Sequence, residues 1–179
     1  IQEFQTEELP LRKSVLRWEE GEGNLYQMQG LLTCDTEAGK VESEKKVTFG
    51  VRTFAADSQG RLALNGRTLF LRGEANCCVF PETGHPPMEV SEWKKFLEKY
   101  REYGVNCMRF HSYCPPEAAF QAADELGMLV QPELSNWNPR EAFETEESYL
   151  YYKKELEAIL RTYGNHPSFV MLTLGNELQ

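Results

Sequence analysis

The chain has 179 residues, of which 41% are hydrophobic, and its formal net charge is −9. This composition is typical of a globular chain with one core and part of a second domain, and it contains no apolar run of the roughly 18 residues that a membrane helix needs. Because the acidic excess comes without a basic cluster, we expect neither nucleic acid nor a membrane surface as a partner.

Residues 1 to about 56 have β character. Short runs of strand-forming residues are separated by turns rich in Gly and Glu, and they lie at 25–28, 31–32 and 46–52. These runs are too few to close two sheets, so we expect residues 1–56 to be the C-terminal part of a β-sandwich. The Asn65-Gly66 pair that follows is the strongest short-range signal for a β-hairpin.

From residue 57 to residue 179 the pattern alternates between strand and helix, which indicates an α/β fold. The expected strands are 69–73, 105–110, 128–133 and 168–174. The expected helices are 91–103 with Ser91 as N-cap and Gly104 as its stop, a second from Pro115-Pro116 to Gly127, and a third from its cap Thr145 to Gly164. The third helix should turn an apolar face inward, formed by Tyr149, Tyr152, Leu156, Ile159, Leu160 and Tyr163.

Four such β/α steps imply a parallel sheet with right-handed crossovers. A complete (β/α)₈ TIM barrel needs about 250 residues. Residues 57–179 therefore suffice for the N-terminal half of a TIM barrel, with about its first four β/α steps.

The fourth expected strand ends on Gly175-Asn176-Glu177. A strand buried on both faces has no reason to finish on an amide and a carboxylate unless that end faces a polar cavity. In barrels and open α/β sheets, ligands bind at the carboxyl ends of the strands. The alternative is a strand that simply runs out into a solvated loop.

Five local motifs occur in a recognisable order. They are Trp18 with Asn24-Leu25-Tyr26, Phe49-Gly50-Val51-Arg52, Leu71-Arg72-Gly73 with Asn76, Asn106-Cys107-Met108-Arg109, and Asn165-His166-Pro167-Ser168 through Gly175-Asn176-Glu177. With these motifs the chain resembles glycoside hydrolase family 2, the family of β-galactosidases, β-glucuronidases and β-mannosidases. In that family an immunoglobulin-like sandwich leads into a catalytic TIM barrel. The resemblance covers the whole chain, and the last motif is its most specific part.

The resemblance implies a retaining exo-β-glycosidase, which removes terminal sugars by double displacement with two carboxyl groups about 5 Å apart. It makes Glu177 the acid/base and Asn176 the partner of the sugar 2-hydroxyl. Arg109 would contact the nucleophilic carboxylate, or alternatively form a salt bridge under a loop. The nucleophile would end the seventh strand, beyond Gln179. We therefore expect a fragment of a longer polypeptide that is inactive without the missing strands of its own barrel.

Four more residues are substrate-binding candidates, each with a structural alternative. His111 would bind a sugar hydroxyl or else hydrogen-bond to backbone, and Glu133 would bind substrate or form a structural pair. Asn76 and Trp137 are expected in loops beside the site, where Trp137 would stack on a sugar or pack against protein. The tyrosines of the third helix are interpreted as core.

Some positions depart from the family pattern. The galactosidase branch has a His where this chain has Cys77-Cys78, and Pro132 to Trp137 lacks the Glu-x-His cluster that holds magnesium in some members. We therefore expect no metal and no other cofactor, and the sugar stays open. The chain's five cysteines, Cys34, Cys77, Cys78, Cys107 and Cys114, fit no zinc or redox spacing, and we interpret them as buried thiols.

Two other functions stay open beside hydrolysis by a family-2 enzyme. One is a non-catalytic carbohydrate-binding or inactive barrel relative, and the other is a hydrolase of another family with the same barrel and Asn-Glu pair. The compartment cannot be read from the residues, and only the resemblance favours a periplasmic or extracellular location. A homo-oligomer is possible.

Overall fold

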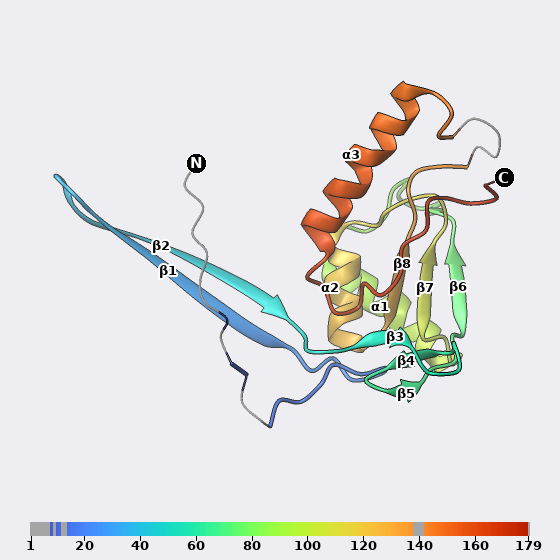
Figure 1. The fold of residues 1–179 in the computed structure, drawn as a ribbon, viewed down its shortest axis with the longest axis horizontal. Helices are drawn as coiled ribbons and strands as arrows, with labels where there is room; N and C mark the ends of the chain where they lie inside the picture. Colours follow the sequence, from blue (N-terminus) through green and yellow to red (C-terminus); the bar gives the residue numbers. More distant parts are fainter. Residues whose placement is uncertain (1–7, 9, 12–13, 138–141, 179) are drawn as a thin grey trace.

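The computed structural model describes residues 8, 10–11, 14–137 and 142–178. In this part of the chain a long two-stranded hairpin leads into a small antiparallel sheet, and an α/β unit with parallel strands follows (Figure 1). No helix in the described residues is long and apolar enough to span a membrane.

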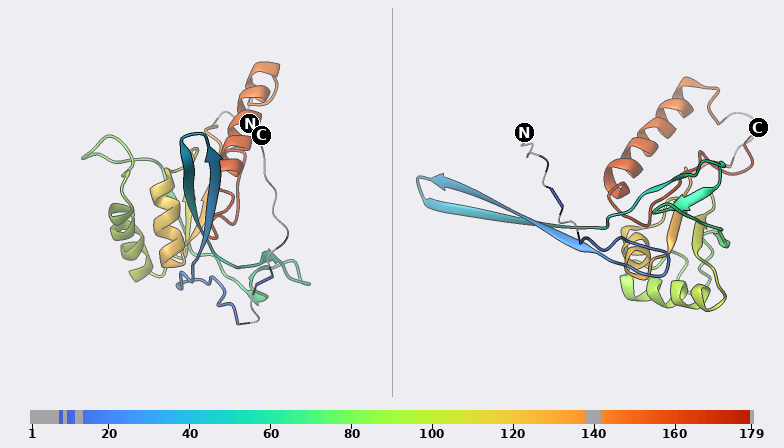
Figure 2. Two further views of the ribbon diagram at one scale, coloured as in Figure 1. Left: turned by 90° about the vertical axis from the view of Figure 1, so that its left-hand side faces the viewer. Right: turned by 60° about the horizontal axis from the view of Figure 1, so that its bottom comes forward.

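The hairpin consists of β1 (Tyr26–Thr36) and β2 (Gly39–Phe49), and it projects from the rest of the molecule (Figure 2). The short runs predicted at 25–28 and 31–32 are one continuous strand, because pairing with β2 continues through Gly30. Alternate side chains lie on opposite faces of a strand. One face of the hairpin is therefore mostly apolar, with Tyr26, Met28, Leu32, Val41, Val47 and Phe49 beside Ser43 and Lys45.

The small sheet has the order β3-β4-β5, formed by Phe54–Ala56, Leu62–Leu64 and Arg67–Thr68. Its Asn65-Gly66 turn has φ angles of 53° and 82°, so the predicted hairpin is confirmed. Because β3 pairs with β4, the domain boundary predicted after residue 56 runs through this sheet. The sheet lies beneath the N-terminal ends of the parallel strands (Figure 1).

The α/β unit alternates as the sequence predicts. Its elements are β6 (Gly73–Asn76), α1 (Val90–Glu102), β7 (Cys107–Phe110), α2 (Glu117–Leu126), β8 (Leu129–Pro132) and α3 (Glu146–Tyr163). The strands β6, β7 and β8 are neighbours in this order and all parallel. The sheet thus grows in one direction along the chain, as successive right-handed β/α steps require.

The fourth predicted strand lies along β8 but contains a bulge. Two parallel bridges join it to β8, Val130↔Phe169 and Glu133↔Thr173. Between these bridges β8 advances by three residues and the fourth strand by four, so one extra residue is inserted. As a result the consecutive residues Val170 and Met171 both pack on the same side of the sheet.

The helix ends follow the predicted signals with one exception. The hydroxyl of Thr145 accepts a hydrogen bond from the backbone N–H of Ser148 (3.2 Å), and α2 ends at Gly127 with φ 66°. Ser91 is not the N-cap of α1, because the helix begins at Val90 and Glu89 holds the cap position without a side-chain bond.

The third helix buries less of its predicted face than the sequence indicates. Ile159 is its only buried residue, whereas Tyr149 and Leu160 are 53% and 50% exposed. Tyr152, Leu156 and Tyr163 pack against the core as predicted, whereas the prediction is wrong for Tyr149 and Leu160. The N-terminal half of α3 extends beyond the sheet, where no described element covers it (Figure 1).

The parallel sheet separates two apolar clusters. The cluster on its helix-covered face includes Trp93, Met108, Phe110, Phe120 and Val130. The cluster on its other face consists of Trp18, Leu64, Leu69, Cys107 and Leu129. Trp18 thus packs in the α/β unit rather than in the sandwich region where the sequence analysis placed it. Its indole N–H donates to the backbone oxygen of Asp124 over 2.7 Å.

The cysteines are only partly buried, which corrects the prediction of buried thiols. Cys107 is buried and Cys114 half-buried, and burial raises the pKa of their thiols to about 11 and about 12. The other three are exposed, because Cys34 lies on the open hairpin and Cys77-Cys78 follow the end of β6. All five are free thiols.

Two glycines that end helices offer a matched test of backbone packing. Gly104 after α1 and Gly127 after α2 both have positive φ, at 79° and 66°. A Cβ on Gly104 would meet nothing closer than 3.9 Å, whereas one on Gly127 would lie 2.4 Å from the backbone N of Glu22. We expect Gly104→Ala to lower the free energy of unfolding by about 1–2 kcal/mol and Gly127→Ala by about 2–5 kcal/mol, because overpacking is added to the strain. Urea titrations that give equal losses would contradict this contrast.

Candidate active site

The carboxyl ends of the parallel strands carry most of the predicted site residues. Arg109 is paired in register with Ala75 and Gln131, and it lies two residues after Cys107 on the same face of β7. That face is opposite to the one covered by α1 and α2. Arg109 is therefore directed to the side of the sheet where Trp18 packs, at the upper end of the strands.

Arg109 joins Glu133 to Asn176. Its Nε donates to Oε1 of Glu133 over 2.6 Å, and its Nη2 donates to Oδ1 of Asn176 over 2.7 Å. Asn176 is only 8% exposed, while the Arg109 side chain is 37% exposed. The guanidinium thus fixes the end of the fourth strand and keeps one edge toward solvent.

Glu133 is completely buried beneath this network. Its Oε2 accepts from the backbone N–H of Ser112 (2.7 Å), and its Oε1 also accepts from the hydroxyl of Thr173 (2.9 Å). Both oxygens are therefore occupied by protein groups, and this arrangement favours the structural alternative for Glu133. Ser112 and Thr173 are not predicted from the sequence, because no single-sequence signal marks a group that acts only by supporting a neighbour.

The environment of Glu133 makes stability depend on pH. Burial alone would raise the pKa of Glu133, but hydrogen bonds from Arg109, Ser112 and Thr173, with the charge of Arg109, lower it below its usual value. Because its folded-state pKa is lowered, ionised Glu133 stabilises the folded state at pH values above its unfolded-state pKa of about 4.3. This stability is lost as the pH falls below that value. We expect Glu133→Gln to flatten the decline in unfolding free energy between about pH 5 and pH 3. Unchanged slopes in urea titrations at these pH values would contradict this role.

Glu177, Trp137 and His111 form a second group at the same end of the sheet. The indole Nε1 of Trp137 donates to Oε2 of Glu177 over 2.8 Å. The ring of His111 meets the ring of Trp137 edge-on, with centroids 5.1 Å apart and planes at 88°. Glu177 is exposed. A carboxylate that projects into solvent at the end of the sheet can exchange a proton with a bound molecule.

The backbone at the strand ends adopts unusual conformations. Cys78, Ser112 and Glu177 have φ angles of 57°, 60° and 52°, a left-handed region that non-glycine residues seldom adopt. Gly175 has φ 138°, and a Cβ there would lie 2.4 Å from the backbone oxygen of Asn136. Such conformations cost free energy and gather at ligand and catalytic sites, which favours a functional reading of this end.

Asn76 is the candidate that the structure does not bring to this face. It is the last residue of β6 and is paired in register with Phe110, so its side chain lies on the helix-covered side. Its Oδ1 accepts from the hydroxyl of Tyr113 and from the backbone N–H of Cys78. Asn76 therefore holds the turn after β6 and does not face Arg109.

Comparisons with known proteins agree on one family. No family model matches the chain. The chain is 30% identical over 166 residues to a proposed β-glucuronidase of Formosa agariphila, covering 93% of this chain and 19% of that protein. It is 26% identical over 165 residues to a β-galactosidase of Lactococcus lactis, covering 89% of this chain and 16% of that protein. The chain thus spans less than a fifth of the length of these curated relatives.

Solved structures give the same result. A β-glucuronidase from Ruminococcus gnavus, in complex with uronic deoxynojirimycin, superposes with a TM-score of 0.73 at 25% identity over 92% of this chain and 28% of that one. A family-2 β-galacturonidase from Eisenbergiella tayi, bound to galacturonate, superposes with a TM-score of 0.78 at 22% identity, over 96% of this chain and 29% of that one. The chain belongs to glycoside hydrolase family 2. The resemblance read from its motifs is confirmed.

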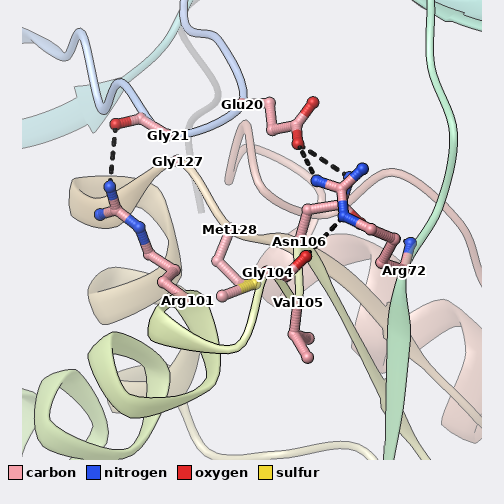
Figure 3. Close-up of a pocket in the computed structure, with 9 residues that line it drawn as sticks. All are labelled: Glu20, Gly21, Arg72, Arg101, Gly104, Val105, Asn106, Gly127 and Met128. Atoms are coloured by element: carbon pink, nitrogen blue, oxygen red, sulfur yellow. Dashed lines mark hydrogen bonds and ion pairs between the residues drawn. The ribbon is translucent and has the colours of Figure 1, made fainter.

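The family-2 chain also has a cavity at the opposite end of its sheet. It measures about 160 Å³ and lies where β7 and β8 begin, lined by Glu20, Arg72, Arg101, Asn106 and Met128 among others (Figure 3). The carboxylate of Glu20 accepts from Arg72 (2.8 Å) and from Asn106 (2.9 Å). These hydrogen bonds hold the segment before β1 against the α/β unit. We therefore interpret the cavity as a packing gap between the two and not as a ligand site.

The part of the chain that the structure describes contains no candidate metal site. No three His, Cys, Asp or Glu side chains among those residues lie close enough together to hold an ion. The expectation that the protein needs no metal remains a prediction.

Proposed function

We propose that the protein containing this chain is a retaining exo-β-glycosidase that removes terminal sugars by double displacement. In this proposal Glu177 is the acid/base, and the nucleophilic carboxylate comes from a part of the polypeptide outside these residues. The observation that carries the proposal is the pair Asn176-Glu177, with the amide held by Arg109 over 2.7 Å and the adjacent carboxylate exposed at the carboxyl end of the sheet.

The proposed reaction needs two proton transfers at Glu177. The protonated carboxyl first gives its proton to the glycosidic oxygen, while the nucleophile attacks the sugar carbon and the bond to the leaving group breaks. The resulting Glu177 carboxylate then takes a proton from water, which attacks the glycosyl intermediate and releases the nucleophile. The exposure of Glu177 supports both roles, because each requires access to a substrate atom.

Asn176 and Arg109 would orient the reactants. The Oδ1 of Asn176 is engaged by Arg109, and its Nδ2 makes no hydrogen bond to another described residue. This leaves the amide N–H₂ to donate to the sugar 2-hydroxyl. Arg109 keeps an exposed edge beyond its bonds to Glu133 and Asn176, where its charge would stabilise an ionised nucleophile.

The same proposal extends to the architecture. The apolar face of the β1-β2 hairpin would be the inner face of one sheet of an immunoglobulin-like sandwich. The strands β6, β7 and β8 with the fourth strand would be the first four strands of a TIM barrel. An open sheet with unpaired edges supports this reading, because isolated parallel sheets need both faces and edges covered.

The experiment is hydrolysis of a panel of aryl β-glycosides by the full-length protein. The panel contains the glucuronide, galacturonide, galactoside and mannoside. The relatives named above cover the first three sugars, and the family also contains β-mannosidases. We expect one sugar to be cleaved, and ¹H NMR of the fresh product to show the β-anomer. An α-anomer would overturn the double-displacement mechanism. Binding of a sugar without cleavage of any would instead support a carbohydrate-binding relative.

A further inference from the structure

We propose that Trp137 is a positioning residue for Glu177 rather than a platform on which a sugar stacks. Its indole N–H holds Oε2 of Glu177, so that Oε1 is the oxygen that delivers the proton. This inference rests on the proposed function, because it assigns a role to Trp137 only if Glu177 is the acid/base.

The chemistry of the two groups determines which oxygen carries the proton. An indole N–H is a donor only, so it can bond to a carboxyl oxygen only through a free lone pair. The 2.8 Å bond from Nε1 to Oε2 of Glu177 is well formed, and it is incompatible with a proton placed on Oε2 toward the indole. A proton pointing elsewhere on Oε2 would still leave that oxygen a weaker acceptor than an unprotonated one, so the bond favours the proton on Oε1.

The indole is itself held in place. His111 packs edge-on against Trp137, with ring centroids 5.1 Å apart and an interplanar angle of 88°. Edge-to-face contacts of this kind favour one orientation of the ring. This contact matters because Trp137 is 62% exposed and has little other packing to orient its ring. His111 thus acts on the carboxyl of Glu177 indirectly, through its contact with Trp137.

The segment after β8 contacts the end of the fourth strand at two successive positions. The backbone oxygen of Asn136 accepts from the backbone N–H of Asn176 over 3.0 Å, and the next residue, Trp137, binds the side chain of Glu177. Glu177 has φ 52°, a conformation that persists only where neighbours enforce it. The backbone contact thus fixes the position of the main chain just before Glu177, and the indole fixes the position of its carboxyl group.

The test compares wild type with Trp137→Phe in the full-length protein. Phenylalanine keeps an aromatic ring beside His111 but lacks the N–H. Two aryl glycosides of the same sugar are used, one with a good and one with a poor leaving group, because only the poor one depends strongly on protonation. We expect kcat/KM, which reports only the first step, to fall about 10- to 100-fold on the poor leaving group, since small misplacements of a catalytic group have effects of this size. On the good leaving group we expect little loss.

Trp93→Phe is the matched control. It also removes an indole N–H bond, from Nε1 to the backbone oxygen of Pro87 (2.7 Å), but in the core beside α1. We expect the ratio of kcat/KM on the two glycosides to equal that of wild type in this variant. Melting temperatures of all variants are measured in parallel, so that a general loss of structure is recognised.

Each outcome has one meaning. An equal loss on both leaving groups would indicate that Trp137 grips the sugar, and no loss on either would remove it from the site. Both results overturn this inference. The proposed function is tested separately by Glu177→Gln in the same assay. If that variant retains wild-type activity on the poor leaving group, the acid/base assignment itself fails, whatever Trp137→Phe does.

Discussion

Replacing Glu177 by Gln in the full-length protein is expected to lower kcat/KM for an aryl glycoside with a poor leaving group by about 10²- to 10⁴-fold, the usual contribution of a general acid. The amide has almost the shape of the carboxyl group, and its oxygen can still accept the indole N–H of Trp137. It cannot release a proton to the glycosidic oxygen or take one from water. The loss should therefore reflect proton transfer alone.

Glu102→Gln provides the control for this experiment. Glu102 is an exposed carboxylate at the end of α1, where it contacts Lys99. We expect this variant to have the activity of wild type, because the residue lies near the start of β7 rather than at its carboxyl end. Initial rates at a fixed enzyme concentration suffice for the comparison. Equal activities of wild type and Glu177→Gln would exclude Glu177 as the acid.

Replacing Trp18 by Ala is expected to lower the free energy of unfolding by about 3–5 kcal/mol, the usual cost of deleting a buried aromatic side chain. Trp18 has no exposed surface and packs with Leu64, Leu69 and Leu129. The substitution also removes the 2.7 Å hydrogen bond from the indole N–H to the backbone oxygen of Asp124. No other large side chain from the segment before β1 is fully buried in the part of the chain that the structure describes.

Trp18→Phe separates packing from hydrogen bonding. Phenylalanine keeps most of the buried ring but not the N–H, and the backbone oxygen of Asp124 loses its donor. We expect the free energy of unfolding of this variant to fall by about 1–3 kcal/mol, the cost of leaving a buried acceptor unsatisfied. Urea unfolding followed by circular dichroism measures both losses. If Trp18→Ala cost no more than Trp18→Phe, the segment before β1 would not contribute to the core of the α/β unit.

Sequence patterns predict the parts of this fold that depend on neighbouring residues. The alternation of strand and helix, the hairpin at Asn65-Gly66, the cap at Thr145 and the stop at Gly127 are all confirmed. Each of these signals acts within about four residues. Ser91 fails as a cap because Val90 is already helical, a shift of one residue that local signals seldom resolve.

The parts that depend on distant partners are not accessible to such patterns. Trp18 is placed by α2 and by strands far along the chain, and Cys77 is exposed because nothing described covers the turn after β6. Asn76 faces the helices because of its register with Phe110. Register was not part of the sequence prediction, which placed this residue only near the site.

The candidate site divides in the same way. Its location and the pair Asn176-Glu177 follow from the end of a strand and from family motifs. The occupation of Glu133 by Ser112 and Thr173, and the bond from Trp137 to Glu177, arise from separate segments that converge only in three dimensions. Ser112 and Thr173 support Glu133 without being recognisable in one sequence, and the sequence marks Trp137 as a candidate without indicating its bond to Glu177.

The extra residue between Phe169 and Thr173 makes the site sensitive to chain length. Side chains along a strand alternate, so each insertion reverses the side on which every later residue appears. With the insertion, Thr173 is opposite Glu133, whereas in an uninterrupted ladder Leu172 would occupy that place. Evolution could exchange the side chains at 170 and 171 for others of similar size at modest cost. Deleting either residue would turn Glu177 and its neighbours toward the helices, so we infer that the number of residues here is under stronger selection than their identity.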